Sequence, residues 1–264
     1  MDLEAYFERV GHHGPRNCSV ETLQALTRAH TEAIPFETID VLLRRPIDLA
    51  SGQLFEKLVR QGRGGYCFEQ NGLFMAVLES LGFRVRPLRA GVRLDQPDRG
   101  IAVGHTHLVL AVEVDGRRWL TDVGVGSTSL TAALQWVDGI VQPTPHDERR
   151  LQREGGRWFH QIRRAGEWLD IYDFSELPMP LPDQLIASWY TSTHPASSFQ
   201  RELIVARALP DGGRASLRGR ELVRRSASGH ALARTLNDAE ALEHALREVF
   251  GLVLPAQDVA LLLA

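Results

Sequence analysis

Apolar residues recur at helical spacing through the first third of the chain. This spacing predicts helices over residues 2–10, 19–33 and 51–60, with Ser19 as the N-cap of the second and Pro35 just beyond its end. A further helix is predicted to begin near Cys67, and Gly82 supplies its stop. Its buried stripe consists of Leu73, Phe74, Val77, Leu78 and Leu81.

From Phe83 the apolar residues alternate with polar ones, as in a strand. Residues 107–114 and 117–123 flank Asp115-Gly116, which is the strongest hairpin signal in the sequence. Shorter strand-like runs follow at 156–163 and 167–174. The middle of the chain is therefore predicted to be an antiparallel sheet or small barrel, and the cluster Pro178, Pro180 and Pro182 closes it.

The last part of the chain mixes both patterns. We expect a short helical or irregular stretch near Ser188, strands over 203–206 and 215–222, and a helix over 238–250 capped by Asn237. The sequence contains no internal repeat and no low-complexity segment, which removes solenoid folds from consideration.

Composition limits the class of protein and its partners. With 44% hydrophobic and 24% charged residues, the chain of 264 residues has the balance of an ordinary folded protein. A net charge of −3 with scattered basic residues predicts no nucleic-acid partner. The acidic start and the absence of long apolar runs predict neither export nor membrane insertion. Only two cysteines, Cys18 and Cys67, occur, so we expect a reducing compartment, the cytoplasm.

Cys67 occupies a position that favours reactivity. It follows the glycine-rich turn Arg63-Gly64-Gly65-Tyr66 and opens a predicted helix. Free N–H groups and the helix dipole at that end favour a thiolate, and the glycines let the backbone approach a substrate closely. Position alone leaves open whether Cys67 is reactive or a buried, inert cysteine.

The hairpin offers a base for this cysteine. If Asp115-Gly116 forms a two-residue turn, Val109 faces Asp122 and His107 is the diagonal neighbour of Asp122 on the same face. Diagonal neighbours lie about 7–8 Å apart, within reach for an imidazole and a carboxylate. His105 shares that face but lies too far along the strand. Cys67, His107 and Asp122 thus have the logic of a nucleophile, a base and an orienting carboxylate, which implies acyl transfer through a thioester if they meet in space.

Other histidines and charged pairs suggest no metal site. No partners at ligand spacing accompany His12, His13, Cys18 or His160. The pairs Arg149-Arg150 and Arg224-Arg225 likewise have no neighbours in the sequence that would indicate a binding site. Surface or core roles are expected for them, and no metal is predicted.

Three ordered motifs resemble those of the arylamine N-acetyltransferases. They are Arg-Gly-Gly-Tyr-Cys-Phe-Glu-Gln-Asn at 63–71, Thr-His-Leu at 106–108 and Asp-Val-Gly-Val-Gly at 122–126. Ile-Pro-Phe-Glu at 34–37, Ser-Thr-His-Pro at 192–195 and Phe-Gly-Leu at 250–252 extend the resemblance over nearly the whole chain. It implies an α+β fold: a helical bundle carrying the nucleophile (1–84), a central antiparallel β-barrel carrying the histidine and aspartate (85–190), and a C-terminal α/β lid (191–264), with a cysteine-protease-like Cys-His-Asp triad.

The resemblance also implies a ping-pong mechanism. Cys67 takes the acetyl group from acetyl-CoA, with His107 as base and Asp122 as orienting group, and an arylamine, arylhydrazine or hydrazide then removes it. Acetyl-CoA is a co-substrate, and no permanently bound cofactor is expected. Such an enzyme belongs to xenobiotic metabolism. The physiological acceptor, the range of acyl donors and the oligomeric state stay open.

Further residues receive roles from the same resemblance. Val103, Gly104, Gly126 and Ser127 are the expected CoA contacts, and Phe36, Thr106 and Val125 the expected acceptor pocket. The family commonly has an aromatic residue where Val125 stands, so the site is predicted to be wider here. Arg63 and Glu37 are expected to form a partly buried pair that braces the loop before Cys67. Backbone N–H groups of Cys67 and of a residue near Thr106 or Gly104 are the expected oxyanion donors.

Two other enzyme classes share this order of nucleophile, base and carboxylate. An amide synthase of the same superfamily uses it to close a macrolactam, and inertness toward acetyl-CoA would favour that alternative. A thiol hydrolase would release the acyl group to water faster than to amines. A catalytically inactive binding protein would require a broken triad, whereas all three residues are present.

Overall fold

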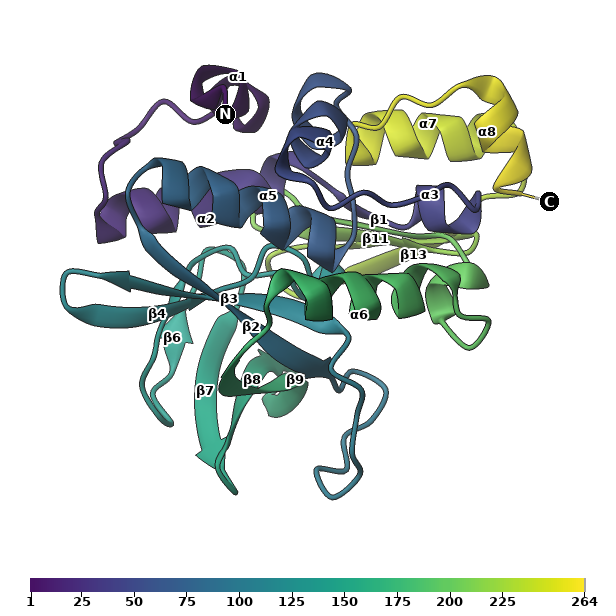
Figure 1. Cartoon of the computed structure of the whole chain (residues 1–264). Coiled ribbons are helices and arrows are strands. Elements are labelled where there is room, and N and C mark those ends of the chain that lie inside the picture. Colours follow the sequence, from purple (N-terminus) through teal and green to yellow (C-terminus); the bar gives the residue numbers. More distant parts are fainter. Residues whose placement is uncertain (264) are drawn as a thin grey trace.

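The computed structural model describes residues 1–263, and the N-terminal helices lie together on one side of the molecule (Figure 1). They are α1 (Leu3–Val10), α2 (Val20–Ala33), α3 (Ile39–Leu42), α4 (Ser51–Phe55) with its π-helical continuation η1 (Glu56–Arg60), and α5 (Cys67–Ser80). The Ser19 hydroxyl accepts a hydrogen bond from the Thr22 N–H at 3.3 Å, so the predicted N-cap of α2 is confirmed. The four predicted helices are all present.

The middle of the chain forms a nearly closed antiparallel barrel. Its strands follow the order β5-β4-β3-β2-β9-β8-β7-β6. The two edge strands are joined by the side chain of Gln142, which accepts from the Gln135 N–H at 2.7 Å and donates to its carbonyl at 3.0 Å. The bounds are β2 Arg84–Val92, β3 His107–Val114, β4 Arg117–Thr121, β5 Leu134–Gln135, β6 Gln142–Pro143, β7 Glu148–Glu154, β8 Arg157–Arg164 and β9 Glu167–Pro178.

The hairpin β3–β4 has the predicted register. Val114 pairs with Arg117 and Leu110 with Thr121, and both turn residues have positive φ, 52° at Asp115 and 68° at Gly116. The two faces of the hairpin serve two cores. Leu108, Leu110, Val112 and Val114 pack against the helices, whereas Val109, Ala111 and Leu120 fill the barrel. The face that carries His107 is therefore the barrel face.

A second, five-stranded sheet contains most of the C-terminal part. Its order is β1-β10-β11-β12-β13, with β1 Phe36–Glu37, β10 Ile204–Ala208, β11 Arg214–Arg218, β12 Glu221–Arg225 and β13 Ala231–Thr235. Helices α7 (Ala239–Phe250) and α8 (Ala256–Leu261) share an apolar core with it. Because β1 comes from the N-terminal region and pairs with β10, this sheet is attached directly to the segment that precedes Cys67.

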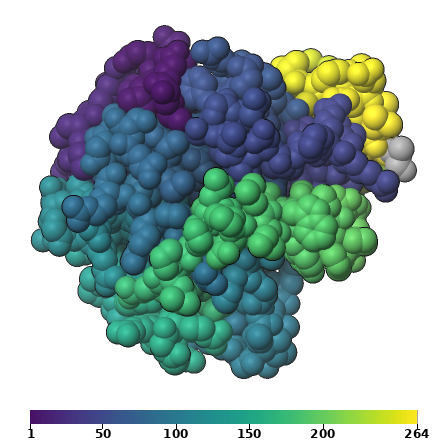
Figure 2. Space-filling view, in the orientation of Figure 1, coloured from purple at the N-terminus to yellow at the C-terminus, as the bar shows by residue number. Residues whose placement is uncertain are grey.

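Helix α6 (Leu181–Thr193) joins the barrel to this sheet. It crosses the middle of the molecule, and Figure 2 shows its green surface between the blue helical part and the teal strands. No helix within residues 1–263 has the length and apolar character needed to cross a membrane.

Two local predictions were wrong. Residues 215–222 are not one strand, because Gly219 (φ 56°) and Arg220 form a turn that splits them between β11 and β12. The N-cap of α7 is Asp238 instead of Asn237, since the Asp238 carboxylate accepts from the Ala241 N–H at 2.8 Å. Asp and Asn cap helices about equally well, so the residue types alone could not decide between Asn237 and Asp238 as the N-cap.

Candidate active site

Cys67 is the first residue of α5 and is held there by its neighbours in sequence. The Glu69 carboxylate accepts from the Tyr66 N–H at 3.1 Å, which fixes the start of the helix. Gly64 lies so close to the preceding segment that a Cβ there would be 2.1 Å from the Pro35 carbonyl oxygen. The glycine turn thus brings the start of α5 against β1, and the Cys67 side chain is buried but borders a cavity.

His107 and Asp122 form a buried hydrogen-bonded pair at the end of the hairpin. The distance from His107 Nε2 to Asp122 Oδ2 is 2.8 Å. The other carboxylate oxygen accepts from Asn71 Nδ2 at 2.8 Å and from the Gly124 N–H at 2.9 Å. With both oxygens occupied, Asp122 fixes the orientation of the imidazole and leaves Nδ1 of His107 free for another partner.

The environment of this pair favours its charged form. Burial acts to lower the pKa of His107, but the charge of Asp122, the hydrogen bond to it and the nearby Cys67 thiol outweigh burial and raise that pKa to about 10. Burial likewise acts to raise the pKa of Asp122, but the charge of His107 and the surrounding hydrogen bonds lower it. At neutral pH an imidazolium facing a carboxylate is the favoured state.

Asn71 joins the helix to the hairpin. It lies one turn after Cys67 on α5, donates to the carbonyl oxygen of Leu108 at 2.8 Å and accepts from the Val123 N–H at 3.0 Å. Gly124 completes this contact, because a Cβ there would lie 2.8 Å from the Cys67 Cα. These contacts bring Cys67 to the end of the hairpin where His107 lies.

The structure brings Arg63 and Glu37 together beneath the Cys67 loop. Arg63 donates to Glu37 Oε1 from Nη2 at 2.7 Å and from Nε at 3.1 Å, and it reaches Asp40 at 3.2 Å. Lys57 continues the network, with its Nζ 2.6 Å from Asp40 and 2.7 Å from Glu69. Burial acts to lower the pKa of Arg63, but the charges of Glu37 and Asp40 outweigh it and raise that pKa.

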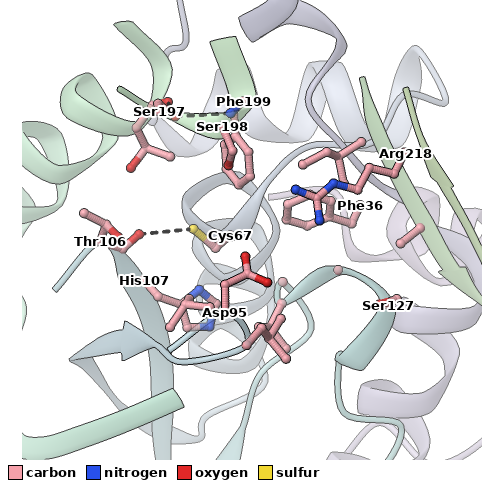
Figure 3. Close-up of a pocket in the computed structure, with 18 of the residues that line it drawn as sticks. Phe36, Cys67, Asp95, Thr106, His107, Ser127, Ser197, Ser198, Phe199 and Arg218 are labelled. Atoms are coloured by element: carbon pink, nitrogen blue, oxygen red, sulfur yellow. Dashed lines mark hydrogen bonds between the residues drawn. The ribbon is translucent and has the colours of Figure 1, made fainter. Parts of the chain in front are cut away.

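A cavity of about 410 Å³ opens onto Cys67. Figure 3 shows the sulfur pointing into it, 3.8 Å from the carbonyl oxygen of Thr106, with Phe36 across the space and His107 beside it. Of the predicted site residues, Phe36, Thr106, Val125, Gly126 and Ser127 line this cavity. Val103 and Gly104 do not; Val103 packs against Gly91, and Gly104 is exposed.

The expected oxyanion donors differ in availability. The Thr106 N–H donates to the Gly104 carbonyl at 2.9 Å and is therefore occupied. The Cys67 N–H is at the first position of α5, where helix N–H groups have no intrahelical acceptor, and it has no partner among the residues that the structure describes.

Several contributors were not anticipated from the sequence. Asn71 could have been found, because its spacing from Cys67 places both on one helix face. The Tyr172 ring, 5.2 Å from that of His107, and the cavity residues Asp95, Phe199 and Arg218 come from segments whose approach no local pattern predicts. Within residues 1–263, no three His, Cys, Asp or Glu side chains are grouped so that they could hold a metal ion.

The fold and the site define the class: an α+β protein whose cysteine, at a helix start, borders a cavity beside a buried His-Asp pair. A family model described as N-acetyltransferase matches residues 19–259. The arylamine N-acetyltransferase of Escherichia coli (strain K12) is 39% identical over 251 residues, which is 95% of this chain and 88% of that protein. That of Mycolicibacterium smegmatis is 43% identical over 225 residues, 84% and 82% of the two chains.

A solved structure of the arylamine N-acetyltransferase of Mycobacterium marinum in complex with CoA agrees with the whole architecture. It matches with a TM-score of 0.93 at 37% identity, over 99% of this chain and 98% of that one. The chain belongs to the arylamine N-acetyltransferase family, and it is accordingly an acyltransferase.

Proposed function

We propose that this enzyme transfers an acetyl group from acetyl-CoA to an arylamine, arylhydrazine or hydrazide through a thioester on Cys67. The observation that carries the proposal is the cavity that opens onto Cys67 beside the 2.8 Å His107–Asp122 hydrogen bond. Its volume of about 410 Å³ lies in the range of small-molecule sites. The M. marinum relative that holds CoA supports the choice of donor.

In the resting enzyme His107 already carries a proton on Nδ1, the ring nitrogen that Asp122 leaves free, so in the first half-reaction Cys67 reacts as the thiolate of a thiolate–imidazolium pair. The sulfur attacks the thioester carbonyl of acetyl-CoA, and the Cys67 N–H at the start of α5 donates to the oxyanion. As the intermediate collapses, the bond to the CoA sulfur breaks and His107 gives its Nδ1 proton to it. CoA leaves as the free thiol, and the acetyl group stays on Cys67.

In the second half-reaction the acceptor nitrogen attacks the Cys67 thioester. Arylamines and hydrazides suit this step because their weakly basic nitrogen keeps its lone pair at neutral pH, whereas an alkylamine is protonated. His107 takes the proton from the attacking nitrogen as the amide forms and gives it to the departing sulfur. The free thiol is regenerated, so each cycle leaves the enzyme unchanged.

The remaining assignments belong to the same proposal. Phe36, Thr106 and Val125 are placed in the acceptor pocket, and Gly126 and Ser127 are the CoA contacts that the cavity supports best. Val103 and Gly104 are proposed to reach CoA outside the cavity. The proposal also divides the chain into the helical bundle 1–84, the barrel 85–190 and the lid 191–264. The two unpaired cysteines suggest a cytoplasmic location.

Two-substrate kinetics test the proposal. Initial rates are measured over a grid of acetyl-CoA and 4-aminobenzoate concentrations, with wild type and Cys67→Ala. A covalent acetyl-enzyme predicts parallel double-reciprocal lines and no activity in the variant. Intersecting lines would contradict it. Acetate release that outpaces amide formation would favour the thiol hydrolase, and inertness toward acetyl-CoA with reactivity toward other thioesters would favour the amide synthase.

A further inference from the structure

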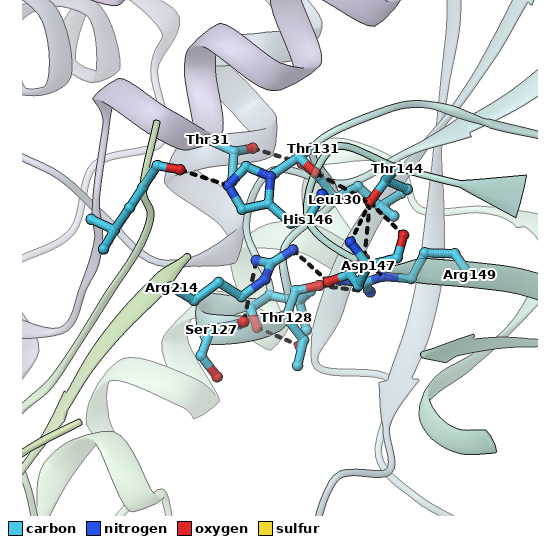
Figure 4. Close-up of polar contacts among 12 residues, drawn as sticks. Thr31, Ser127, Thr128, Leu130, Thr131, Thr144, His146, Asp147, Arg149 and Arg214 are labelled. Carbon is cyan, nitrogen blue, oxygen red and sulfur yellow. Dashed lines mark hydrogen bonds and ion pairs between the residues drawn. The ribbon is translucent and has the colours of Figure 1, made fainter. Parts of the chain in front are cut away.

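Asp147, a largely buried carboxylate, lies between two buried arginines next to the wall of the cavity. Asp147 accepts from Arg149 at both carboxylate oxygens, with 2.8 Å from Nη2 to Oδ2, and Oδ2 also accepts from Arg214 Nη2 at 2.8 Å. Arg149 comes from β7 of the barrel and Arg214 from β11 of the five-stranded sheet (Figure 4). Asp147 therefore joins the two sheets where they meet.

Each arginine also donates one hydrogen bond to the backbone of the same short segment, and Arg149 Nη1 lies 3.2 Å from His160 Nε2 as well. Arg214 Nη1 donates to the carbonyl oxygen of Ser127 at 3.2 Å, and Arg149 Nη1 donates to that of Thr128 at 2.9 Å. These two carbonyls belong to the 3-10 turn η2 (Gly126–Thr128). Gly124, Val125, Gly126 and Ser127 form the wall of the cavity on this side.

These three side chains are largely shielded from water, so their charges depend on one another for partners. The side chain of Arg149 is fully buried, and those of Arg214 and Asp147 are 9% and 10% exposed. Burial acts to lower the pKa of Arg214, and the positive charge of Arg149 lowers it further. The negative charge of Asp147 opposes both effects only in part, so the pKa falls to about 10. Two guanidinium groups of like charge stay close together only because one carboxylate bonds to both. Without Asp147 their arrangement on the turn would not persist.

We propose that Asp147 and Arg214 are positioning residues for the acceptor side of the reaction. Asp147 orients the two guanidinium groups, and these hold the carbonyls of Ser127 and Thr128, so that the wall 124–127 keeps a fixed distance from Cys67. The cluster touches neither Cys67 nor His107 by any hydrogen bond among the described residues. It acts on the shape of this wall, which a bulky acceptor meets at Val125 and CoA meets at Gly126 and Ser127, and it leaves the chemistry at sulfur unchanged. This inference rests on the proposed acetyl transfer.

The test uses Arg214→Lys, which keeps the positive charge beside Asp147. A lysine has one head group where arginine has a fork, so it cannot serve both Asp147 and the Ser127 carbonyl in the same geometry. Acetyl-enzyme is prepared with acetyl-CoA, separated from it, and discharged by hydrazine or by 2-aminofluorene. We expect discharge by 2-aminofluorene to slow roughly tenfold and that by hydrazine less than about twofold, because small displacements penalise only an acceptor that touches the wall.

Two further variants serve as a matched control and as a second test of the cluster. Arg247→Lys makes the same chemical change at an exposed ion pair with Glu243 on α7, 3.4 Å long and away from the cavity, and should leave the ratio of the two discharge rates at the wild-type value. Asp147→Asn should change the ratio in the same direction as Arg214→Lys. If Asp147→Asn does not fold, Arg214→Lys decides the question.

Hydrogen–deuterium exchange provides a readout that needs no catalysis. Amides of 124–129 should exchange faster in Arg214→Lys and not in Arg247→Lys. Equal slowing with both acceptors, or an unchanged ratio with unchanged exchange, would overturn the positioning role. If wild type forms no acetyl-enzyme, the proposed function fails, and the exchange measurement still decides whether the cluster holds the turn.

Discussion

Gly124 is the position where a single methyl group should separate the cysteine from the hairpin. A Cβ at this residue would lie 2.8 Å from the Cys67 Cα and 2.9 Å from Asn71 Nδ2. Carbon atoms in contact are normally about 3.5–4.0 Å apart, so Gly124→Ala forces a displacement of roughly 0.7–1.2 Å. The nearest obstacle is backbone and cannot rotate away, so the start of α5 and the hairpin must move apart.

Two magnitudes follow from this displacement. Overpacking of a buried site costs about 1–3 kcal/mol. For a chain of this size that lowers the melting temperature by roughly 2–12 °C. A misplacement of about 1 Å at a reacting group costs on the order of 10²-fold in rate, so acetyl transfer should fall by that factor. The loss of activity should be far larger than the loss of stability explains.

The assay compares Gly124→Ala with Gly52→Ala. Gly52 lies in α4, and a Cβ there meets nothing within 4 Å, so this control should keep full activity and gain up to about 1 kcal/mol from helix propensity. Acetyl transfer and thermal unfolding are measured for both. A Gly124→Ala enzyme with the wild-type rate and melting temperature would refute the close contact between α5 and the hairpin.

Three other changes have definite expected outcomes. Arg63→Ala should lower the free energy of unfolding in urea by about 3–5 kcal/mol, because it leaves the fully buried Glu37 side chain without its main cation; an unchanged midpoint would contradict this. The raised pKa of His107 means that its contribution to stability is complete below pH of about 6.5 and lost as the pH rises through about 10, so His107→Gln should flatten the decline that wild type shows over this range. Val125→Phe should narrow the cavity and reduce kcat/KM for 2-aminofluorene relative to 4-aminobenzoate by roughly 10-fold, whereas an equal effect on both acceptors would remove Val125 from the acceptor pocket.

The hairpin shows how much of the site can be predicted from the sequence. Alternation and the Asp115-Gly116 turn determine the register, and the register alone places His107 and Asp122 on one face. Helical spacing likewise places Cys67 at a helix start. The docking of that helix on the hairpin could not be derived, because it depends on a contact between Asn71 of α5 and the Leu108 carbonyl of β3, two elements far apart in the sequence. The resemblance to a family supplied that step.

Other features were beyond the sequence for a different reason. The strands β11 and β12 are separated only by Gly219 and Arg220. The apolar positions shift there from Ala215 and Leu217 to Leu222, and the prediction of a single strand overlooked this break. Asp147, Arg149 and Arg214 look like ordinary charged residues in the sequence. Their burial arises where β7 and β11 meet, and no local pattern records a contact between elements so far apart.

The most direct test of the proposed mechanism is to locate the acetyl group. Enzyme is mixed with acetyl-CoA without acceptor, and intact mass and peptide mapping are compared for wild type, Cys18→Ser and Cys67→Ser. We expect one acetyl group in wild type and in Cys18→Ser, on the peptide that contains Cys67, and its loss on addition of 4-aminobenzoate. An acetyl group that persists in Cys67→Ser at the wild-type level, or that an arylamine does not remove, would contradict the mechanism.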